Sequence, residues 1–401
     1  MLAVIDTHPV QYRAPVYRAL EHRFGLQVTA VYGSDASLVG YRDSEFGVSV
    51  TWDTDLLSGY RSVFLSSRLR NSQEALPDWR TTRRVKIALA EIRPRAVLVV
   101  GYSPRFYRVA ASCAWHMGVP VLFRGETTDH AWRRGLAKRI ARDWMLRRFY
   151  RGCARLLYLG RRSYEHFRRL GCAEEKLIFS PYCVDASTFR WNDAARAELR
   201  SAGRTDLGVD ERDSVLLFSG KLSARKGPDL LLRAVKESCA SVCGRIIVVF
   251  LGDGPMRESL RALAQDTPRT EVRLLGFRNQ SELSRYYHAA DVLVLPSLQG
   301  ETWGLVVNEA LQHGLPCVLS AAVGCVPDLI DPGTTGEVFD TGSVKSLAAA
   351  LGRAMRLVGR ADVRAQCREK VGGYTIERAA EGIARAYRAV VGTPARAGAP
   401  S

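Results

Sequence analysis

Short apolar runs alternate with amphipathic segments along the whole chain. In the first half, runs rich in Val, Ile and Leu predict strands over residues 2–6, 26–32, 95–101, 119–123, 155–159 and 177–180. In the second half, the same pattern predicts strands over 215–219, 245–251, 271–276, 292–296 and 317–320, and helices that begin near Pro228, Pro255, Ser281 and Gly304. Strands that alternate with helices are typical of βαβ units, so the pattern predicts an α/β fold with parallel sheets.

The order of these elements predicts two doubly wound, Rossmann-like domains that face each other across a ligand cleft. A chain of 401 residues is long enough for two cores. We place the first domain at residues 1–190 and the second at 191–372, because the strand pattern fades between Val184 and Thr205. A last helix within 373–392 could cross back to the first domain, and the Gly/Pro/Ala tail at 393–401 is expected to be disordered.

The net charge and the cysteines indicate the kind of partner and the cellular location to expect. The net charge of +17 indicates an anionic partner, which could be a nucleic acid, an anionic membrane surface or a phosphate-bearing substrate. The nine scattered cysteines form no Cys-x-x-Cys pair and indicate neither a disulfide framework nor a zinc ribbon. Because the first strand follows Met1 directly and no apolar run is long enough to cross a bilayer, we expect a cytoplasmic protein, or one peripheral to a membrane.

A basic, glycine-containing loop joins strand to helix at residues 219–228. Gly220 and Gly227 allow close backbone approach, Lys221 and Lys226 supply charge, and the following helix presents free N–H groups. These are the features that bind phosphate. A solvated basic turn is an equally good interpretation of this loop taken alone.

A second strand–loop–helix unit carries two carboxylates. Glu301 lies in the loop, and Glu309 lies in the helix among apolar neighbours such as Val306 and Ala310. An unpartnered carboxylate is costly to bury, so Glu309 should have a hydrogen-bond partner in the protein or on a ligand. The alternatives are a favourable charge at a helix N-terminus for Glu301 and an exposed polar position for Glu309.

Two more strand ends carry glycine. Gly252-Asp-Gly254 follows one strand, and the sequence Leu275-Gly-Phe277 ends the next. Such turns are weak evidence singly, because Gly and Asp also serve purely steric roles in turns. Together with the two loops above, four successive strand ends could line one side of a nucleotide cleft.

In order and spacing, these motifs resemble the donor domain of the retaining family-4 glycosyltransferases, which have the GT-B fold. The resemblance covers residues 215–337. It implies a hexosyltransferase that uses a nucleoside-diphosphate sugar, with UDP favoured over GDP, and no metal. Lys226 and Lys221 would hold the diphosphate together with the amides of Gly304 and Leu305. Glu309 would hold the ribose hydroxyls, and Glu301 would face the transferred sugar. Gly220, Gly252, Gly254 and Phe277 would line the nucleotide.

The first half resembles the acceptor domains of some of these enzymes through residues 8–15 and 52–60. This chain has His8-Pro9 where many relatives have a Gly-Gly turn. Either Glu126 or His130, which follow a central strand, could serve the acceptor. The acceptor itself could be a glycan, a lipid-linked oligosaccharide or a small metabolite, in glycan or polysaccharide biosynthesis.

Asp53-x-Asp55 raises the separate question of a metal, because paired aspartates bind one in other glycosyltransferases. No strand–helix context of the nucleotide-binding type surrounds this pair. We therefore expect no metal, and we expect cationic side chains to stabilise the leaving diphosphate.

The basic segment over residues 132–169 has two interpretations. Trp132, Leu136, Ile140 and Trp144 recur at four-residue spacing among Arg and Lys residues, as in a helix that rests on anionic lipid. The alternative is a helix that packs its apolar stripe into the first domain. The sequence favours this packed helix, because Arg133 and Arg147 interrupt the stripe.

Two rival functions remain open. The charge also suits a nucleic-acid-binding protein, although no recognition helix, zinc module or aromatic RNA-binding motif accompanies it. A nucleotide-sugar epimerase, or another enzyme with the GT-B architecture such as a phosphorylase, is the second rival. A phosphorylase would need a pyridoxal-binding lysine context that the sequence lacks.

Overall fold

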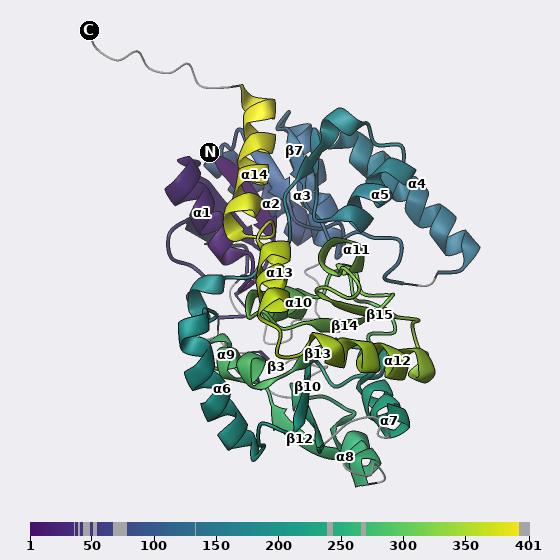
Figure 1. Cartoon of the computed structure of the whole chain (residues 1–401). Coiled ribbons are helices and arrows are strands. Elements are labelled where there is room, and N and C mark those ends of the chain that lie inside the picture. Colours follow the sequence, from purple (N-terminus) through teal and green to yellow (C-terminus); the bar gives the residue numbers. More distant parts are fainter. Residues whose placement is uncertain are drawn as a thin grey trace.

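The computed structural model consists of two α/β domains with parallel sheets, stacked one above the other in Figure 1. It describes residues 1–35, 37–38, 41–42, 49–50, 54–66, 78–132, 134–238, 244–265 and 270–392. The tail at 393–401, together with Trp52, Asp53 and Arg133, lies outside the described residues. The α/β class and the pair of doubly wound domains predicted above are confirmed.

The first sheet has seven strands in the order β5-β2-β1-β6-β7-β8-β9. These are β1 (Leu2–Asp6), β2 (Val28–Tyr32), β5 (Arg61–Phe64), β6 (Ala96–Val99), β7 (Val121–Phe123), β8 (Arg155–Tyr158) and β9 (Leu177–Phe179). The accompanying helices are α1 (Ala14–Phe24), α2 (Asp78–Ile92), α3 (Arg105–His116), α4 (Leu136–Gly152) and α5 (Arg161–Arg169). A short antiparallel ribbon, β3 (Tyr41–Arg42) with β4 (Ser49–Val50), stands apart from both sheets.

The second sheet has six strands in the order β12-β11-β10-β13-β14-β15. These are β10 (Ser214–Ser219), β11 (Ile246–Leu251), β12 (Thr270–Gly276), β13 (Val292–Leu295), β14 (Cys317–Ser320) and β15 (Gly336–Phe339). Its helices are α6 (Asp193–Leu207), α7 (Pro228–Ser238), α8 (Arg257–Gln265), α9 (Gln280–Ala289), α10 (Leu305–Gln312), α11 (Val326–Leu329), α12 (Val344–Ala354) and α13 (Ala361–Val371).

Strands buried on both faces account for the continuous apolar runs in the second half. In β11, Ile247 and Val249 join the cluster that packs under α6, α9, α10 and α13. Ile246 and Val248, which point the other way, join the cluster under α7, α8 and α12. Helices on both faces of a parallel sheet leave the carboxyl ends of its strands as the place for a ligand.

The last helix, α14 (Ile376–Val391), belongs to the first domain. Ala380 and Ile383 are buried in the core of the first domain, and α14 packs against α1 (Figure 1). Gly382 makes this packing possible, because a Cβ there would lie 2.1 Å from the carbonyl oxygen of Phe179. The chain therefore begins and ends in the same domain.

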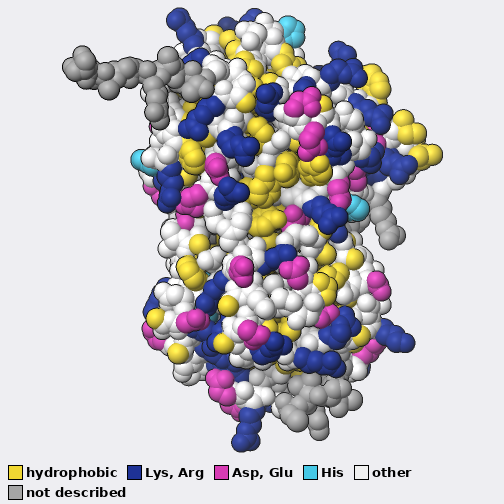
Figure 2. Space-filling model, turned by 45° about the horizontal axis from the view of Figure 1, so that its top comes forward, with side chains coloured by type: hydrophobic (Ala, Val, Ile, Leu, Met, Phe, Trp, Pro, Cys, Tyr) yellow, Lys and Arg dark blue, Asp and Glu magenta, His cyan; other side chains and the backbone are white. Residues whose placement is uncertain are grey.

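The edge strands β5 and β15 are absent from the sequence-based prediction. Residues 61–64 of β5 are exposed or half-buried, and β15 carries Glu337, so neither has the continuous apolar run of an inner strand. In the described part of the chain, no helix is long and apolar enough to span a bilayer. Lys and Arg side chains, with fewer acidic ones among them, spread over the face drawn in Figure 2.

Candidate functional site

Glycine turns bring the carboxyl ends of β10, β11 and β12 into direct backbone contact. The Gly220 amide donates to the carbonyl of Leu251 at 2.8 Å, and the Gly252 amide donates to the carbonyl of Gly276 at 2.8 Å. A Cβ on Gly252 would lie 2.0 Å from the Gly220 carbonyl oxygen. With φ angles of 137° and 156°, Gly252 and Gly254 also adopt backbone conformations that other residues rarely tolerate. The three turns therefore form one compact edge.

Lys226 and Glu301 meet at the centre of this edge. Lys226 Nζ donates a hydrogen bond to Glu301 Oε2, and Ser297 Oγ donates to the same oxygen at 3.0 Å. Gly227 permits the approach, because a Cβ there would lie 2.7 Å from the carbonyl oxygen of Pro296. The Lys226 and Glu301 side chains are only 14% and 11% exposed, so water screens this ion pair weakly.

The N-terminus of α10 lies directly behind the pair. Gly304 precedes the helix with φ 103°, and the sharp turn leaves the first amides of α10 without partners inside the helix. Gly324 packs under the same loop, because a Cβ there would lie 1.9 Å from the carbonyl oxygen of Thr302. A cationic side chain beside a helix N-terminus is suited to bind an anion.

Glu309 is buried one turn further along α10. Tyr287 Oη donates to Glu309 Oε2 at 2.6 Å, and Ser219 at the end of β10 hydrogen-bonds to the Tyr287 hydroxyl. Burial raises the pKa of Glu309 to about 7, and the bond from Tyr287 lowers it only in part. The predicted partner of the Glu309 carboxylate is thus a protein hydroxyl. This chain of contacts ties Glu309 to the same strand ends as Lys226.

Lys221 and Phe277 lie on the neighbouring loops, and both side chains are half-buried. Lys221 follows Gly220 directly, and Phe277 follows the end of β12. Between these loops, Asp253 accepts hydrogen bonds from the Gly254 amide at 2.8 Å and from Arg257 Nη1 at 3.1 Å. These bonds fix the turn after β11, so Asp253 orders the loop that carries the glycines.

A chain of charged groups reaches this edge from the first domain. Buried Asp6, at the end of β1, accepts from Arg13 Nη1 at 2.8 Å, and Arg13 Nη2 lies 3.3 Å from Glu126 Oε1. Glu126 Oε2 in turn accepts from Thr302 Oγ1 at 3.0 Å. Burial lowers the pKa of Arg13, but the Asp6 carboxylate and the hydroxyls of Tyr12, Tyr107 and Tyr17 together raise it above its usual range. Glu126 therefore lies at the junction of the two domains, in contact with Thr302, the residue that follows Glu301.

The other two candidates from the first half lie differently. The His130 side chain is exposed at the surface. Asp55 accepts from the amides of Leu57 and Ser58 at 3.0 and 3.1 Å, and these bonds contribute to lowering its pKa to about 2. Within the described ranges, no cluster of three His, Cys, Asp or Glu side chains could hold a metal ion.

Several residues at this edge are not among the sequence-based candidates. Thr302, Tyr287 and Ser297 each hydrogen-bond a carboxylate that the sequence singles out. Only Asp6 has a sequence signal that could have been used, since it is an acidic residue at the end of an apolar strand. The others depend on contacts between segments that are far apart in the chain.

The second half of the chain matches a known protein family in sequence. Residues 200–371 match the family model described as glycosyl transferases group 1. A D-inositol 3-phosphate glycosyltransferase of Segniliparus rotundus is 32% identical over 228 residues, which are 54% of this chain and 48% of that protein. A protein of the same description from a Nocardioides species is 36% identical over 186 residues, 42% of this chain and 39% of that protein. The matches thus span about half the length of these relatives or less.

Solved structures match the fold over nearly the whole chain. Sucrose-phosphate synthase from Thermosynechococcus elongatus superposes with a TM-score of 0.71 at 18% identity, covering 97% of this chain and 98% of that one. Anabaena HepE in complex with UDP gives 0.71 at 16% identity, with 97% and 99% covered. The solved structures thus share the fold of this chain, and the sequence match to the glycosyl transferases group 1 model covers residues 200–371.

Proposed function

We propose that this protein transfers a sugar from a nucleoside diphosphate, in the first instance UDP, to an acceptor hydroxyl with retention of configuration, as in family 4. The observation that carries the proposal is the pairing of Lys226 with Glu301 at the N-terminus of α10, beside the glycine turns. A diphosphate needs cationic groups and backbone amides, and a sugar needs a carboxylate for its hydroxyls. This edge offers all three within one loop cluster.

Each side chain then has a defined task. Lys226 and Lys221, with the amides of Gly304 and Leu305, stabilise the charge that grows on the departing diphosphate, which is the role a divalent ion has elsewhere. Gly220, Gly252 and Gly254 let the backbone approach the nucleotide. Glu309 accepts from the ribose hydroxyls, and Glu301 accepts from hydroxyls of the transferred sugar. No metal is required for this arrangement.

The reaction balances without a protein nucleophile. The bond between the sugar and the diphosphate breaks, and the acceptor oxygen forms a new bond on the same face of the sugar. The acceptor proton passes to an oxygen of the leaving diphosphate. Closure of the two domains excludes water, which would otherwise hydrolyse the donor.

Glu126 is the first-domain residue that we propose to face the acceptor. Its carboxylate is held by Arg13 and by Thr302, the residue that follows Glu301. His130, which is exposed, is the alternative that the sequence offers. The relatives are described as D-inositol 3-phosphate glycosyltransferases, and this supports a small polyhydroxy acceptor. A glycan or a lipid-linked acceptor would meet the same carboxylate.

The direct test is release of UDP from UDP-sugars, measured with and without candidate acceptors. We expect Lys226→Ala and Glu309→Ala each to reduce transfer at least about a hundredfold, as loss of one preorganised electrostatic contact does elsewhere. Lys236→Ala, on the exposed end of α7, is the matched control and should retain full activity. Normal turnover by the Lys226 variant refutes the proposal. Conversion of the donor alone would indicate an epimerase, and salt-sensitive DNA binding without turnover would indicate a polyanion-binding protein.

We also propose that α4 places the protein on the inner, anionic face of a membrane. Leu136, Ile140 and Trp144 are 64%, 60% and 69% exposed, and Trp132 is 43% exposed. The structure thus corrects the packed-helix interpretation of this stripe. The buried face of α4 is formed by Asp143, Leu146, Phe149 and Tyr150, and the apolar stripe points outward. At the right edge of Figure 2, apolar side chains project beside Lys and Arg, on the side where Figure 1 draws α4.

The charges around the exposed stripe of α4 favour an anionic membrane as its binding partner. The exposed face continues with Arg147, Arg148 and Arg151, and the one acidic residue of α4, Asp143, is buried and paired with Arg169. An apolar stripe followed by a basic patch fits the interface of an anionic bilayer. The stripe also begins at the site, because Trp132 packs on Gly300 and the Gly300 amide donates to the carbonyl of Ala131 at 2.5 Å.

Vesicle sedimentation tests this docking. We expect binding to vesicles that contain phosphatidylglycerol and little binding to pure phosphatidylcholine. Leu136→Ser with Ile140→Ser and Trp144→Ser should remove most of the binding, whereas Ile87→Ser on α2, also exposed, should not. If the three serines leave vesicle binding unchanged, or abolish self-association of the chain instead, the membrane proposal is wrong.

A further inference from the structure

A second polar cavity lies at the opposite edge of the second sheet. It has a volume of about 320 Å³ and lies between α6, the end of α9 and the start of α13. Asp291 precedes β13 and Pro316 precedes β14, so this cavity is at the amino ends of these strands. Lys226 and Glu301 lie past the carboxyl ends, so the cavity is separate from the site described above.

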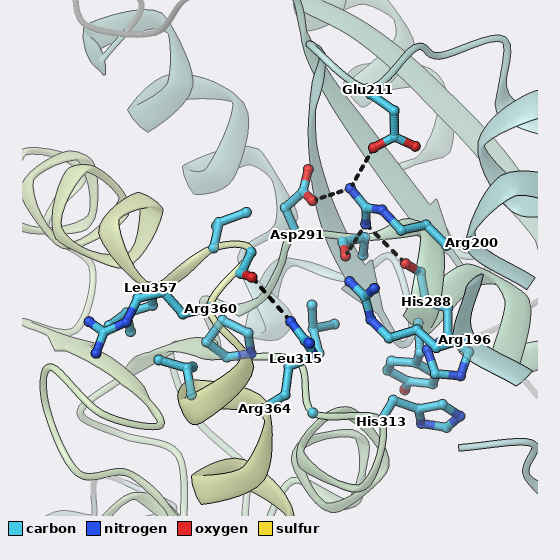
Figure 3. A pocket seen from close by; sticks show the side chains of 17 residues that line it. Arg196, Arg200, Glu211, His288, Asp291, His313, Leu315, Leu357, Arg360 and Arg364 are labelled. Atoms are coloured by element: carbon cyan, nitrogen blue, oxygen red, sulfur yellow. Dashed lines mark hydrogen bonds and ion pairs between the residues drawn. The ribbon is translucent and has the colours of Figure 1, made fainter. Parts of the chain in front are cut away.

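Arginines dominate the cavity wall (Figure 3). Arg200 is engaged by the protein, since it pairs with Asp291 at 2.9 Å and with Glu211 at 3.5 Å. Arg360 likewise pairs with Asp362. These two arginines are compensated by carboxylates, and their structural role accounts for their presence.

Arg196 and Arg364 differ from these two arginines in their contacts. Within the part of the chain that the structure describes, neither forms an ion pair with a carboxylate, and Arg364 Nη1 donates only to the carbonyl of Gly359 at 3.1 Å. Both guanidinium groups face the cavity in Figure 3. Burial lowers the pKa of Arg196, and the positive charges of Arg364 and Arg200 lower it further. The carboxylates of Asp193 and Asp291 offset these effects in part without forming an ion pair with Arg196. Two half-buried cations that make no direct ion pair favour an anion between them.

Two residues that line the cavity each have a buried polar atom without a hydrogen-bond partner among the described residues. These are the Nε of Arg364, a donor, and the Nδ1 of His288. His288 is 2% exposed, its Nε2 lies 2.8 Å from the carbonyl oxygen of Arg190, and burial lowers its pKa to about 4. The ring is therefore neutral at pH 7 with its proton on Nε2, and Nδ1 is an acceptor. A buried acceptor without a donor is costly unless a ligand supplies one.

We propose that this cavity binds a phosphate ester of a small polyhydroxy compound, with the phosphate between Arg196 and Arg364 and a hydroxyl donating to His288. Leu315, Pro316, Leu357 and Val358 complete the wall with apolar surface for the carbon skeleton. The volume is at the lower end of that of small-molecule sites and suits a sugar-sized ligand.

The same cavity is coupled to the donor site through Tyr287. Tyr287 lines the cavity and donates to Glu309 at 2.6 Å, and its ring stacks on His313 at 5.0 Å between centroids. His313 Nδ1 lies 2.7 Å from the carbonyl oxygen of Glu309. A ligand that shifts these rings alters the carboxylate that we assign to the ribose, and the effect on the two affinities is reciprocal. The coupling between the two affinities rests on the proposed function, whereas binding of the ester to the cavity does not.

Calorimetry on the full chain at about 0.15 M salt tests the binding step, because screening at that ionic strength suppresses loose polyanion attraction. The probes are glucose 6-phosphate, inorganic phosphate and glucose. We expect the ester to bind, inorganic phosphate to bind more weakly and glucose not to bind. Arg196→Gln and Arg364→Gln should each weaken the ester about ten- to a hundredfold, the loss expected for a charged hydrogen-bond partner.

Three control variants test whether the effect is specific to the cavity. Arg261→Gln removes an exposed charge on α8 and should change the affinity less than twofold. Lys226→Ala alters the donor site and should leave ester binding unchanged. Arg364→Lys, which retains the charge without the fork, should lie between wild type and Arg364→Gln and guards against a variant that simply misfolds. The proposal is wrong if the ester does not bind, or if inorganic phosphate binds as tightly as the ester. It is also wrong if Arg261→Gln weakens ester binding as much as the cavity variants do, or if Lys226→Ala weakens ester binding.

The coupling is measured as the affinity for UDP with and without saturating glucose 6-phosphate. We expect a change of at least about fivefold, the lower end of allosteric couplings. Tyr287→Phe should abolish this change while leaving the ester affinity within about twofold. An unchanged UDP affinity in the wild type disproves the coupling. If UDP does not bind at all, the proposed function fails, whereas the cavity is judged by the ester titration alone.

Discussion

Glu309 is deeply buried and has a pKa near neutrality. The fraction of Glu309 that is ionised therefore changes with pH around pH 7. The carboxyl accepts one bond from Tyr287, and its pKa is about 7 because burial disfavours the charged form. An ionised carboxylate is the better acceptor for ribose hydroxyls. The environment of this single residue therefore predicts how nucleotide binding depends on pH.

We expect the affinity for UDP to rise as the pH increases from about 6 to 8, through the pKa of Glu309. Glu309→Gln should bind UDP about ten- to a hundredfold more weakly at pH 8, since a hydrogen bond to a charged group contributes about 1.5–3 kcal/mol. Its affinity should keep only the shallower pH dependence that comes from the terminal phosphate of UDP, whose second pKa is about 6. Calorimetry at several pH values measures both effects, and a parallel pH profile in the variant would contradict the assignment.

The same pKa also affects folding stability, with the opposite sign. The folded-state pKa of Glu309 is raised above its ordinary value, so the native state holds a proton that the unfolded chain has released. The contribution of Glu309 to stability is therefore present below the unfolded pKa of 4.5 and is lost as the pH rises through about 7. Glu309→Gln should flatten this fall when the free energy of unfolding is measured against pH.

The sequence singled out individual residues of the site but not their contacts. The family resemblance implies a diphosphate for Lys226 and a sugar for Glu301, which stays a prediction, and the structure brings the two side chains into direct contact. Their separation of 75 residues hides that contact from the sequence. Thr302 carries no sequence signal either, because its role depends on Glu126 in the other domain.

Among the elements, the turns between strands and helices have the strictest requirements. Gly252 has φ 137°, and a Cβ there would lie 2.0 Å from the carbonyl oxygen of Gly220. Gly352, inside helix α12, has nothing within 4 Å of an added Cβ. The two positions make a matched pair for the same substitution.

We expect Gly252→Ala to destabilise the protein by about 1–3 kcal/mol, as overpacking does, and to weaken UDP binding because the loop must shift. Gly352→Ala should instead stabilise the protein by about 0.5–1 kcal/mol, because alanine is the better helix former. Chemical denaturation of both variants checks the two signs. A Gly252→Ala protein with unchanged stability would show that the turn can relax.

Inner strands were easier to predict from the sequence than edge strands. β1, β10 and β11 are buried along their whole length and give continuous apolar runs. β5 has a mixed pattern because its residues are exposed or half-buried, and the apolar run of β15 is interrupted by Glu337, which is buried and paired with Arg353. Helix α4 shows a related limit of sequence-based prediction. Its four-residue periodicity identifies an apolar face but does not show whether the rest of the protein covers that face.

At the scale of the whole molecule, the two domains touch through polar contacts beside the site. Thr302 donates to Glu126 at 3.0 Å, and the Arg161 amide donates to Asp328 at 2.9 Å. The Trp303 ring fits against Gly160, where a Cβ would lie 2.4 Å from the ring. Closure of the cleft therefore depends on a few groups that lie close to the proposed reaction.

We expect Thr302→Val to slow sugar transfer about tenfold, because Glu126 loses a hydrogen bond whose contribution is about 1.5 kcal/mol. Donor affinity should stay within about twofold, since Thr302 contacts the acceptor side. Thr302→Ser retains the hydroxyl and should behave as wild type. Steady-state kinetics with UDP calorimetry separate the two quantities, and an equal loss in Thr302→Ser would point to packing instead of the hydrogen bond.

Helix α14 has a consequence for how the protein is made. Its side chains fill the core that β1 and α1 begin, so the first domain is assembled from segments that are more than 350 residues apart in the sequence. During synthesis, the second domain can fold on emerging from the ribosome, whereas the first must wait with an open apolar groove until translation reaches residue 391. The nascent chain is thus most vulnerable to proteases and chaperone capture between β1 and β9, as long as α14 has not been made.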